Sequence, residues 1–378
     1  MKVLFIIPDM SSGGTQRKVI MLLRYLNSKK IYPKLVLFKK EGVHLSELPD
    51  DVRIIDLKKR SRYSFFILIL KLAKIFRSEK PDKIISFIYY SNIISVLAKI
   101  ISRISSTLII SEESVPFGYL LNTRMGDVKR ALIRFTYRKA QKIICVSKGL
   151  REYIIKYCGL PESRVIAIYN PIESEKIYKL SIEEVKHPFF DKKIDGELLI
   201  ISTGRLSIAK RYDILLKVIE NVRERKKVNL IIIGDGELKK DLIIQRNNLK
   251  LNDCVEFIGY QQNPYAWMSK SDLFVMTSQY EGFSYVIVEA MACGVPVISS
   301  DCPFGPIEII RNNINGNLVP FGDIEKISNN VIDMFNDERR RHRMILAGKI
   351  RSLDFDINKI GKEYELIIFN RTAVNLRT

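Results

Sequence analysis

The sequence has few cysteines and histidines, and it lacks the spacings in which these residues bind metals. Five cysteines and three histidines occur in 378 residues, and no two cysteines form a CxxC pair. This argues against a disulfide framework or a zinc knuckle and favours a reduced, cytoplasmic protein. A content of 47% hydrophobic and 28% charged residues excludes disorder and collagen. At this length the chain has room for two or three domains of about 100–200 residues.

Long apolar runs are also missing. Only five apolar residues stand between Lys2 and Pro8, whereas a secretory signal needs roughly 7–15. The longest apolar stretch, 84–101, is interrupted by serines and a lysine, and a membrane-spanning helix needs about 20 mostly apolar residues. We therefore interpret 3–7 as a buried strand and 84–101 as a strand followed by a buried helix.

Negative charge is scarce in the first half of the chain. Residues 1–170 carry 32 Lys and Arg against 13 Asp and Glu, a net charge of +19, whereas residues 171–378 have a net charge of +1. Such an excess is typical of a surface that faces nucleic acid or an anionic membrane. A solvated, lysine-rich surface without a partner is the alternative.

One segment of the basic half, 60–77, combines large apolar residues with flanking cations. The residues that could share an apolar face are Phe65, Phe66, Leu68, Ile69, Leu72, Ile75 and Phe76. The cations around them are Lys58, Lys59, Arg60, Arg62, Lys71, Lys74 and Arg77. This composition is typical of a helix lying in the membrane interface. A helix that packs on the core with a basic outer face has the same pattern, so both interpretations stay open.

Strand-like apolar runs alternate with helix-length segments along the whole chain. The runs are 3–7, 35–38, 84–88, 108–110, 143–146, 198–203, 230–233, 255–258, 273–277 and 297–300. This alternation predicts an α/β protein with two doubly wound parallel sheets, joined by a seam between residues 169 and 196. Because ligands bind beyond the carboxyl ends of such strands, we expect the site in a central cleft that both domains face.

Two glycines, Gly13 and Gly14, follow the first strand and open a helix. Paired glycines let the backbone approach a phosphate, and a helix N-terminus favours negative charge. The signal is weak alone, since such turns often contain glycine for packing. The full GxGxxG spacing of a dinucleotide site is missing, which argues against an oxidoreductase.

Two cations, Arg205 and Lys210, follow the run at 198–203 and could clamp a diphosphate. Arginine offers a bidentate fork and lysine a point charge. Taken alone, this motif also fits a solvated basic loop.

The segment 280–290 carries the strongest signal. Ser284 is a candidate N-cap for a helix that runs to Cys293. Glu281 then lies in the loop before the helix, and Glu289 lies in its second turn among apolar residues. Because burying an unpaired carboxylate costs several kcal/mol, Glu289 needs a partner. Sugar hydroxyls are one candidate, and a buried arginine or backbone amides are the other.

The order of these motifs resembles the retaining glycosyltransferases of family 4, which have the GT-B fold of two Rossmann-like domains. The resemblance rests on Gly13-Gly14, Gly204-Arg205 with Lys210, the Gly-Asp-Gly-Glu run at 234–237, Glu281 and Glu289. The segments 145–148, 168–171, 257–260, 294–298 and 302–309 also fall in family order. We accordingly expect an acceptor-binding domain over 1–172, completed by a C-terminal helix at about 356–378, and a nucleotide-sugar-binding domain over 173–355.

The resemblance implies a role for each motif. Arg205 and Lys210 would hold the donor diphosphate and stabilise charge on the leaving nucleotide. These two residues and Glu281 would be catalytic. Glu289 would bind the ribose, and the turn at 258–260, with Ile258, would contact the base. Glu281 and the backbone of 282–284 would hold the donor sugar. The whole donor-binding set would be Gly13, Gly14, Gly204, Arg205, Lys210, Ile258, Glu281, Gly282, Phe283, Ser284 and Glu289. Neither a metal nor a cofactor is expected, since the UDP-sugar is the donor substrate, so 235–237 is not interpreted as a metal site.

One position departs from the family pattern. Members often carry a Ser-Glu-His run after the fourth strand of the first domain, and here the run is Ser111-Glu112-Glu113-Ser114. Glu113 is the candidate to replace the histidine as the acceptor-side catalytic group, while Glu112 could simply hold the loop. The family's same-face displacement, in which the leaving phosphate takes the acceptor proton, needs no protein base.

These features predict a glycosyltransferase that moves a hexose or N-acetylhexosamine from a UDP-sugar to a growing cell-surface glycan, with retention. The expected acceptor is a glycan linked to polyprenyl diphosphate, and the basic half would hold the enzyme peripherally on the anionic cytoplasmic face of the membrane. The alternatives are a sugar-nucleotide epimerase, which the scarcity of histidine disfavours, and a non-catalytic scaffold of a glycan-assembly complex. A nucleic-acid binder is disfavoured because the cations are scattered among Ile/Leu helices.

Overall fold

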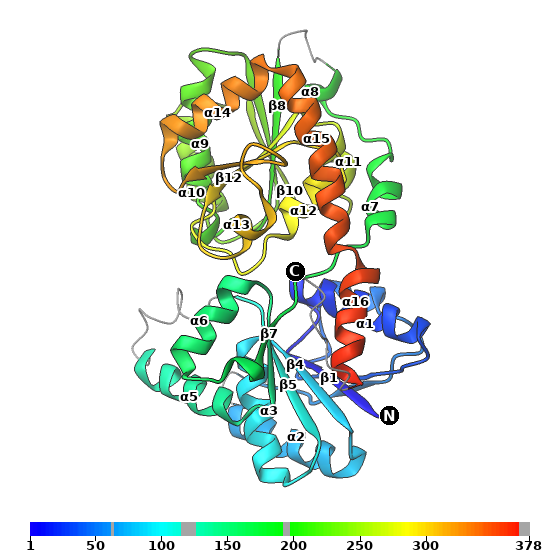
Figure 1. The fold of residues 1–378 in the computed structure, drawn as a ribbon. Coiled ribbons are helices and arrows are strands. Elements are labelled where there is room, and N and C mark those ends of the chain that lie inside the picture. Colours follow the sequence, from blue (N-terminus) through cyan, green and yellow to red (C-terminus); the bar gives the residue numbers. More distant parts are fainter. Residues whose placement is uncertain (62–63, 115–125, 192–196, 370–378) are drawn as a thin grey trace. The chain divides into compact units, whose positions relative to one another are not determined.

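The chain forms two compact units, seen in a computed structural model that describes residues 1–61, 64–114, 126–191 and 197–369 (Figure 1). The first unit comprises Met1–Pro171 and the chain from Ile357 onward, and the second comprises Ile172–Asp356. The chain therefore returns to the first unit through its last helix, α16 (Ile357–Ile368). The crossings expected from the sequence are at 172/173 and at about 355/356.

A seven-stranded parallel sheet forms the centre of the first unit, in the order β3-β2-β1-β4-β5-β6-β7. Its strands are β1 (Val3–Ile7), β2 (Lys34–Leu37), β3 (Ile54–Asp56), β4 (Lys83–Phe87), β5 (Thr107–Glu112), β6 (Lys142–Cys145) and β7 (Val165–Ala167). Besides α16, its helices are α1 (Gly14–Ser28), α2 (Phe65–Glu79), α3 (Tyr89–Ser102), α5 (Gly126–Lys139) and α6 (Lys148–Cys158). Helix α3 packs between α2 and α5, while α1 packs on α16.

A six-stranded parallel sheet forms the centre of the second unit, in the order β10-β9-β8-β11-β12-β13. Its strands are β8 (Leu198–Thr203), β9 (Val228–Ile233), β10 (Val255–Gly259), β11 (Leu273–Met276), β12 (Val297–Asp301) and β13 (Asn317–Pro320). Its helices are α7 (Ser174–Ser181), α8 (Pro188–Asp191), α9 (Tyr212–Arg223), α10 (Lys239–Asn248), α11 (Tyr265–Ser269), α12 (Tyr285–Ala292), α13 (Gly305–Ile309), α14 (Ile324–Asn336) and α15 (Glu338–Ser352).

Burial on both faces explains why the central segments are strands. Every residue of β1 and of β8 is buried, as expected for parallel strands with helices on both sides of the sheet. In each sheet the strand order reverses beside the first strand, between β1 and β4 and between β8 and β11. The carboxyl ends next to such a reversal are where ligands bind in open α/β sheets.

The predicted α/β class with two doubly wound parallel sheets is confirmed. The sequence does not predict three of the strands, β3, β7 and β13. Each has only three or four residues and lies at a sheet edge. Because an edge strand has a neighbour on one side only, it needs less of the continuous apolar pattern that marks the central strands.

The segment 60–77 is helical only from Phe65 onward, so Lys58, Lys59 and Arg60 precede α2 in a loop, and Arg62 lies outside the described residues. Five residues pack into the core: Leu68, Ile69, Leu72, Ala73 and Phe76. Phe66, expected on that apolar face, is instead 75% exposed, because at 100° per residue it falls beside the buried stripe. Within the described ranges, no helix combines the length and apolarity needed to cross a bilayer.

The loops after β8 and β9 are in backbone contact through a glycine. A side chain at Gly234 would place its Cβ 2.0 Å from the carbonyl oxygen of Gly204, and the φ of Gly234 is +139°. Gly322 also has a positive φ, +82°, but its Cβ would meet nothing within 4 Å. The two positions therefore separate the cost of a left-handed backbone from the cost of a steric overlap.

We expect Gly234→Ala to lower the unfolding temperature by roughly 10 °C and Gly322→Ala by only roughly 3 °C. The reason is that only the first substitution forces two backbone segments apart. Differential scanning fluorimetry of both variants measures the difference. Equal shifts would mean that the two loops can separate without cost.

Candidate active site

The predicted site residues Lys210 and Glu281 are in direct contact. Lys210 ends the 3-10 turn Ile208–Lys210 after β8, and Glu281 lies in the loop after β11. Because β8 and β11 are neighbours in a parallel sheet, both loops leave the same edge. Lys210 Nζ lies 2.5 Å from Glu281 Oε1, with the side chains 23% and 10% exposed. The cation expected at the donor diphosphate thus touches the carboxylate expected at the donor sugar.

Hydrogen bonds to the main chain also join the two loops. Thr277 Oγ1 donates to the carbonyl oxygens of Lys210, at 3.2 Å, and Arg211, at 2.9 Å. The N–H of Gln279 donates to the carbonyl oxygen of Ala209 at 2.8 Å. The position of Lys210 is therefore set by the loop after β11 as well as by its own strand.

The backbone predicted to hold the donor sugar, 282–284, packs against the segment after β12. Glu281 forms a β-bridge with Phe304, and a Cβ on Gly305 would lie 2.9 Å from Phe283 Cα. The ring of Phe283 packs edge-to-face on Phe355, with centroids 5.4 Å apart. These contacts fix the backbone between Glu281 and the start of α12.

Ser284 occupies the N-cap position of α12, but its side chain forms no cap hydrogen bond. Its hydroxyl lies 3.2 Å from Met276 Sδ instead. The predicted position is therefore right, whereas the cap interaction is not formed, because the buried hydroxyl turns toward β11. The first N–H groups of the helix, with their partial positive charge, are left without a serine cap.

Arg205 and Lys210 form ion pairs with different carboxylates. Arg205 Nε lies 3.1 Å from Glu237 Oε2, and the arginine side chain is 74% exposed. Glu237 follows β9, on the opposite side of β8 from Glu281. An exposed ion pair contributes about 0–1 kcal/mol, so it restrains Arg205 only weakly. A role for Arg205 at a diphosphate stays a prediction.

Glu289 has a partner that the sequence analysis missed. The carboxylate is 1% exposed, and its Oε1 accepts a hydrogen bond from the hydroxyl of Tyr265, at 3.1 Å. Tyr265 begins α11, which packs on α12. Nothing in the sequence relates residue 265 to residue 289, because the pair is formed by helix packing. The predicted ribose contact of Glu289 stays untested.

Two predicted glycine-containing turns lie at strand ends. Ile258 is half-buried, and the carbonyl of the next residue, Gly259, accepts a hydrogen bond from the N–H of Gly234 at 2.9 Å. In the first unit, Gly13 is the N-cap of α1 and Gly14 its first residue. The Oε1 atom of Gln16 lies 2.5 Å from where a Cβ of Gly13 would be, so the glutamine folds over that turn.

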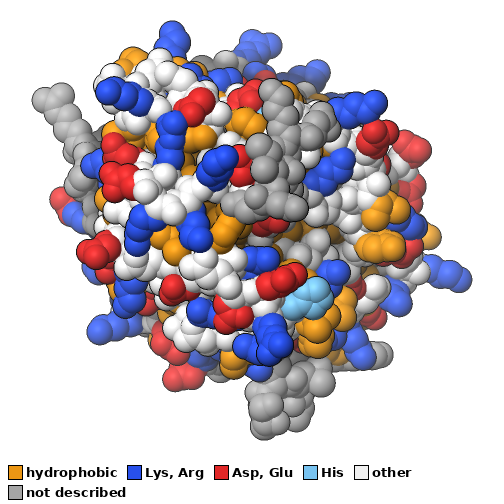
Figure 2. Space-filling model, turned by 90° about the horizontal axis from the view of Figure 1, so that it is seen from above, with side chains coloured by type: hydrophobic (Ala, Val, Ile, Leu, Met, Phe, Trp, Pro, Cys, Tyr) orange, Lys and Arg blue, Asp and Glu red, His pale blue; other side chains and the backbone are white. Residues whose placement is uncertain are grey.

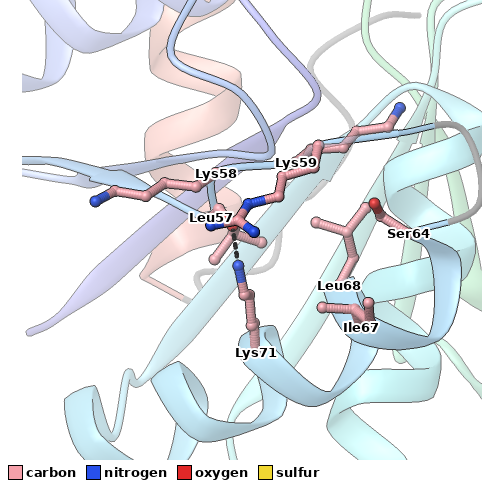
Figure 3. A pocket seen from close by; sticks show the side chains of 8 residues that line it. Leu57, Lys58, Lys59, Ser64, Ile67, Leu68 and Lys71 are labelled. Carbon is pink, nitrogen blue, oxygen red and sulfur yellow. Dashed lines mark hydrogen bonds between the residues drawn. The ribbon is translucent and has the colours of Figure 1, made fainter.

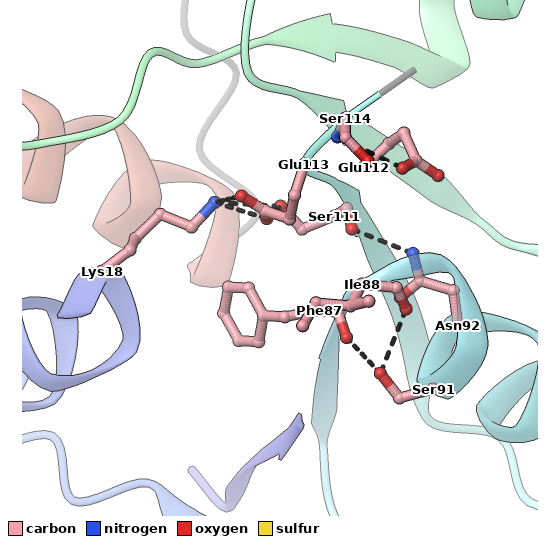
Figure 4. A network of polar contacts seen from close by, with 9 residues as sticks. All are labelled: Lys18, Phe87, Ile88, Ser91, Asn92, Ser111, Glu112, Glu113 and Ser114. Carbon is pink, nitrogen blue, oxygen red and sulfur yellow. Dashed lines mark hydrogen bonds and ion pairs between the residues drawn. The ribbon is translucent and has the colours of Figure 1, made fainter. Parts of the chain in front are cut away.

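Of the two glutamates after Ser111, Glu112 is buried and Glu113 is half-buried, and each has its own partner. The hydroxyl of Tyr137 donates to Glu112, and burial raises the pKa of Glu112 to about 8. Glu113 is paired with Lys18, whose Nζ lies 2.5 Å from Oε1 and 2.7 Å from Oε2 (Figure 4). The sequence analysis did not single out Lys18. Its signal was available, since Lys18 stands four residues before Leu22 on the buried side of α1.

Among the residues that the structure describes, no group of three or more His, Cys, Asp or Glu side chains could hold a metal ion. Asp235 and Glu237 instead have cationic neighbours, Lys239 at 3.7 Å and Arg205 at 3.1 Å. The expectation that catalysis needs no metal remains a prediction, since metal dependence is a property of the reaction.

Two family models match the chain in succession. The model described as Glycosyltransferase Family 4 matches residues 12–176, and the model described as Glycosyl transferases group 1 matches residues 184–351. The first match covers most of the first unit, and the second lies within the second unit.

Two proteins of Campylobacter jejuni subsp. jejuni serotype O:2 are similar over nearly the whole chain. One is N-acetylgalactosamine-N,N'-diacetylbacillosaminyl-diphospho-undecaprenol 4-alpha-N-acetylgalactosaminyltransferase, 28% identical over 363 residues, which cover 94% of this chain and 96% of that protein. The other is GalNAc-alpha-(1->4)-GalNAc-alpha-(1->3)-diNAcBac-PP-undecaprenol alpha-1,4-N-acetyl-D-galactosaminyltransferase, 27% identical over 380 residues, which cover 97% and 98%. Among solved structures, Anabaena HepE in complex with UDP-glucose shares the fold, with a TM-score of 0.81, 20% identity and coverage of 98% and 100%.

The buried carboxyl group of Glu112 makes stability depend on pH. The folded state keeps this proton up to about pH 8, whereas in an unfolded chain the carboxyl group has its ordinary pKa of 4.5 and loses the proton near that pH. The folded state therefore binds more protons between these values, and the contribution of Glu112 to stability falls as pH rises. We expect Glu112→Gln to unfold roughly 5 °C above wild type at pH 8.5 and at nearly the same temperature at pH 5.

Thermal unfolding from pH 5 to 9 measures this difference, with Glu152→Gln, an exposed position on α6, as the control. The control is expected to follow wild type at every pH. A glutamine variant at position 112 that also follows wild type would show that the carboxyl is ionised in the folded protein.

Proposed function

This chain belongs to the group 1 glycosyltransferases of the GT-B fold, and we propose that it uses a UDP-sugar as donor. The family membership that the motifs indicated is thereby confirmed. The proposed reaction transfers a hexose or N-acetylhexosamine, with retention, to a growing cell-surface glycan carried on polyprenyl diphosphate. The acceptor class follows the names of the two Campylobacter relatives, which act on undecaprenyl-diphosphate-linked glycans. The donor class follows HepE, which has been crystallised with UDP-glucose.

The observation that carries the proposal is the Lys210–Glu281 pair at the carboxyl ends of β8 and β11. An ammonium group has three N–H donors, so Lys210 can keep Glu281 and still bind a phosphate oxygen. Arg205 can leave its exposed partner Glu237 at little cost, because charged hydrogen bonds to a diphosphate are each worth about 1.5–3 kcal/mol. Glu281 remains beside Lys210 as a hydrogen-bond acceptor for the hydroxyls of the donor sugar.

In the proposed reaction the bond between sugar C1 and the β-phosphate oxygen of UDP breaks. A bond from C1 to the acceptor oxygen forms on the same face of the sugar. The acceptor proton passes to the leaving phosphate, so UDP leaves with the bonding electron pair and the proton. Lys210 stabilises the charge that develops on that phosphate, which is where an aligned cation lowers the barrier most.

A membrane contact is proposed at one surface of the first unit, the α2 surface, made of Lys58, Lys59, Arg60, Phe66, Ile67 and Leu70. The three apolar side chains are 75%, 56% and 61% exposed, although the other side of α2 packs into the core. The three cations line a pocket of about 180 Å³ whose apolar lining includes Ile67 (Figure 3). Apolar side chains ringed by lysine and arginine are typical of helices that lie in a membrane interface.

Other functions fit these observations less well. A nucleic-acid binder would present a continuous basic stripe, but on the face drawn in Figure 2 the Lys and Arg side chains are interspersed with Asp and Glu. An epimerase would require protein acid and base groups beside the sugar, and Glu281 is held by Lys210. A non-catalytic scaffold would not depend on either residue, which the following experiment tests.

We expect UDP and at least one UDP-sugar to raise the unfolding temperature of the wild-type protein, because binding stabilises the folded state. Lys210→Ala and Glu281→Gln should each lower kcat by roughly 10²–10³, measured as UDP release and as sugar transfer to a polyprenyl-diphosphate-linked acceptor. Lys217→Ala, an exposed lysine on α9, is the control and should leave kcat unchanged. Full transfer by Glu281→Gln would remove the catalytic role of Glu281, and a wild type that binds UDP but transfers no sugar would favour a scaffold. A wild type that binds no nucleotide would overturn the proposal.

For the α2 surface we expect the triple variant Lys58→Gln, Lys59→Gln, Arg60→Gln to lose roughly 100-fold in affinity for anionic vesicles. The reason is that each cation near such a surface contributes about 1 kcal/mol. Co-sedimentation with vesicles that contain about 20% phosphatidylglycerol, and with vesicles that contain none, measures the loss. The matched control removes three exposed lysines of the second unit, Lys217, Lys227 and Lys240. Equal binding by both triple variants would show that net charge, and not this surface, attracts the membrane.

A further inference from the structure

A lysine is buried at the carboxyl edge of the first sheet. Lys18 is 0% exposed, and its Nζ contacts both oxygens of Glu113, at 2.5 and 2.7 Å, and lies 3.4 Å from Ser111 Oγ (Figure 4). The same nitrogen lies 5.4 Å from the ring centroid of Phe87 and 6.0 Å from that of Tyr364, on α16. Helices α1 and α16 and the ends of β4 and β5 thus enclose one ion pair.

The enclosure keeps Lys18 charged. Burial by itself lowers the pKa of a lysine, but the charge of Glu113, with a smaller effect of Tyr364, more than offsets burial, so the pKa of Lys18 is raised. The other titratable groups around Glu113 are Glu112 from β5 and Cys145 from β6. A buried ion pair of this kind is seldom the most stable filling of a core, since apolar residues of similar volume often stabilise a fold as well or better.

The hydrogen bonds of Glu113 leave room for one more donor. A carboxylate offers about four lone-pair positions, two on each oxygen. Among the described residues, Oε1 accepts from Lys18 and from Ser111 Oγ, at 2.6 Å, whereas Oε2 accepts from Lys18 alone. The Glu113 side chain is 7% exposed, so it is not wholly enclosed. Its place, directly after β5 and two strands from β1, is at the sheet edge where ligands bind in such folds.

We propose that Lys18 is a positioning residue for glycosyl transfer, which holds Glu113 as an ionised carboxylate whose Oε2 accepts a hydrogen bond from the acceptor hydroxyl. This inference rests on the proposed function and deepens it on the acceptor side. Glu113 orients the hydroxyl and keeps no proton, because the proton leaves with the UDP phosphate. Helix α16 takes part through Tyr364, which covers Lys18, so the returning C-terminal segment helps to build the acceptor site.

The test separates positioning from mere structural support by removing both charges. Lys18→Met and Glu113→Gln each leave one buried charge unpaired, and we expect both single variants to unfold at a lower temperature than wild type. The double variant has no unpaired charge and should regain most of that loss. If the pair only supports the fold, the double variant also regains transfer. If Lys18 acts through Glu113, the double variant stays roughly 100-fold below wild type in kcat/KM for the acceptor, while its affinity for UDP is unchanged.

The pH profile supplies a second readout that structural support would not move. In Lys18→Met the carboxylate has lost its counter-charge, so it takes up a proton at higher pH, and the acid limb of kcat/KM should move up by at least one pH unit. The same pH profiles are measured in the Glu112→Gln background, because this substitution removes the neighbouring titratable group. Lys34→Met breaks a half-buried ion pair with Glu79 away from the carboxyl edge and should leave the acid limb in place.

The outcomes distinguish this inference from the proposed function. Wild-type kcat/KM in the double variant, or an acid limb that does not move in Lys18→Met, would overturn the positioning role while leaving the transferase intact. A wild type that transfers no sugar would instead overturn the proposed function. Should Lys18→Met fail to fold, the double variant still decides between the two roles.

Discussion

Parallel pairing of the strands is the constraint on which both candidate sites depend. When every strand of a sheet runs in one direction, every following loop leaves the same edge, so residues far apart in sequence meet there. Lys210 and Glu281 are 71 residues apart and lie 2.5 Å apart in space, because β8 and β11 are neighbours. Lys18 and Glu113 are 95 residues apart and meet in the same way, after β1 and β5 of the other sheet.

Each of three carboxyl groups at or after the ends of these strands has a side-chain partner. Glu113 has a lysine, Glu289 a tyrosine hydroxyl and Glu112 a second tyrosine hydroxyl. Burial raises the pKa of Glu112 to about 8, and the side-chain donor beside it is a neutral hydroxyl. Two adjacent glutamates at the end of β5 therefore have chemically different partners, a hydroxyl and an ammonium.

Helix α2 has two apolar sides, which explains why its sequence fits two interpretations. Leu68, Ile69 and Leu72 pack into the core, and α2 lies against α3. Phe66, Ile67 and Leu70 remain exposed, and Ile67 lines a pocket together with the lysines of the preceding loop. Core packing is thus shown for one side of the helix, and the membrane contact proposed for the other side does not compete with it.

The sequence alone determined the α/β class, the two doubly wound sheets and the family, because continuous apolar runs and the order of local motifs can be recognised along the chain. It also indicated Lys210 and Glu281 as site residues and Glu289 as a carboxylate in need of a partner. Which partners they have was decided only by the tertiary structure: Lys210 contacts Glu281, Arg205 turns to Glu237, and Tyr265 donates to Glu289. Lys18 and the edge strands β3, β7 and β13 were also not predicted from the sequence. The physical reason is that such contacts depend on strand order and helix packing, which bring together residues that no spacing along the chain relates.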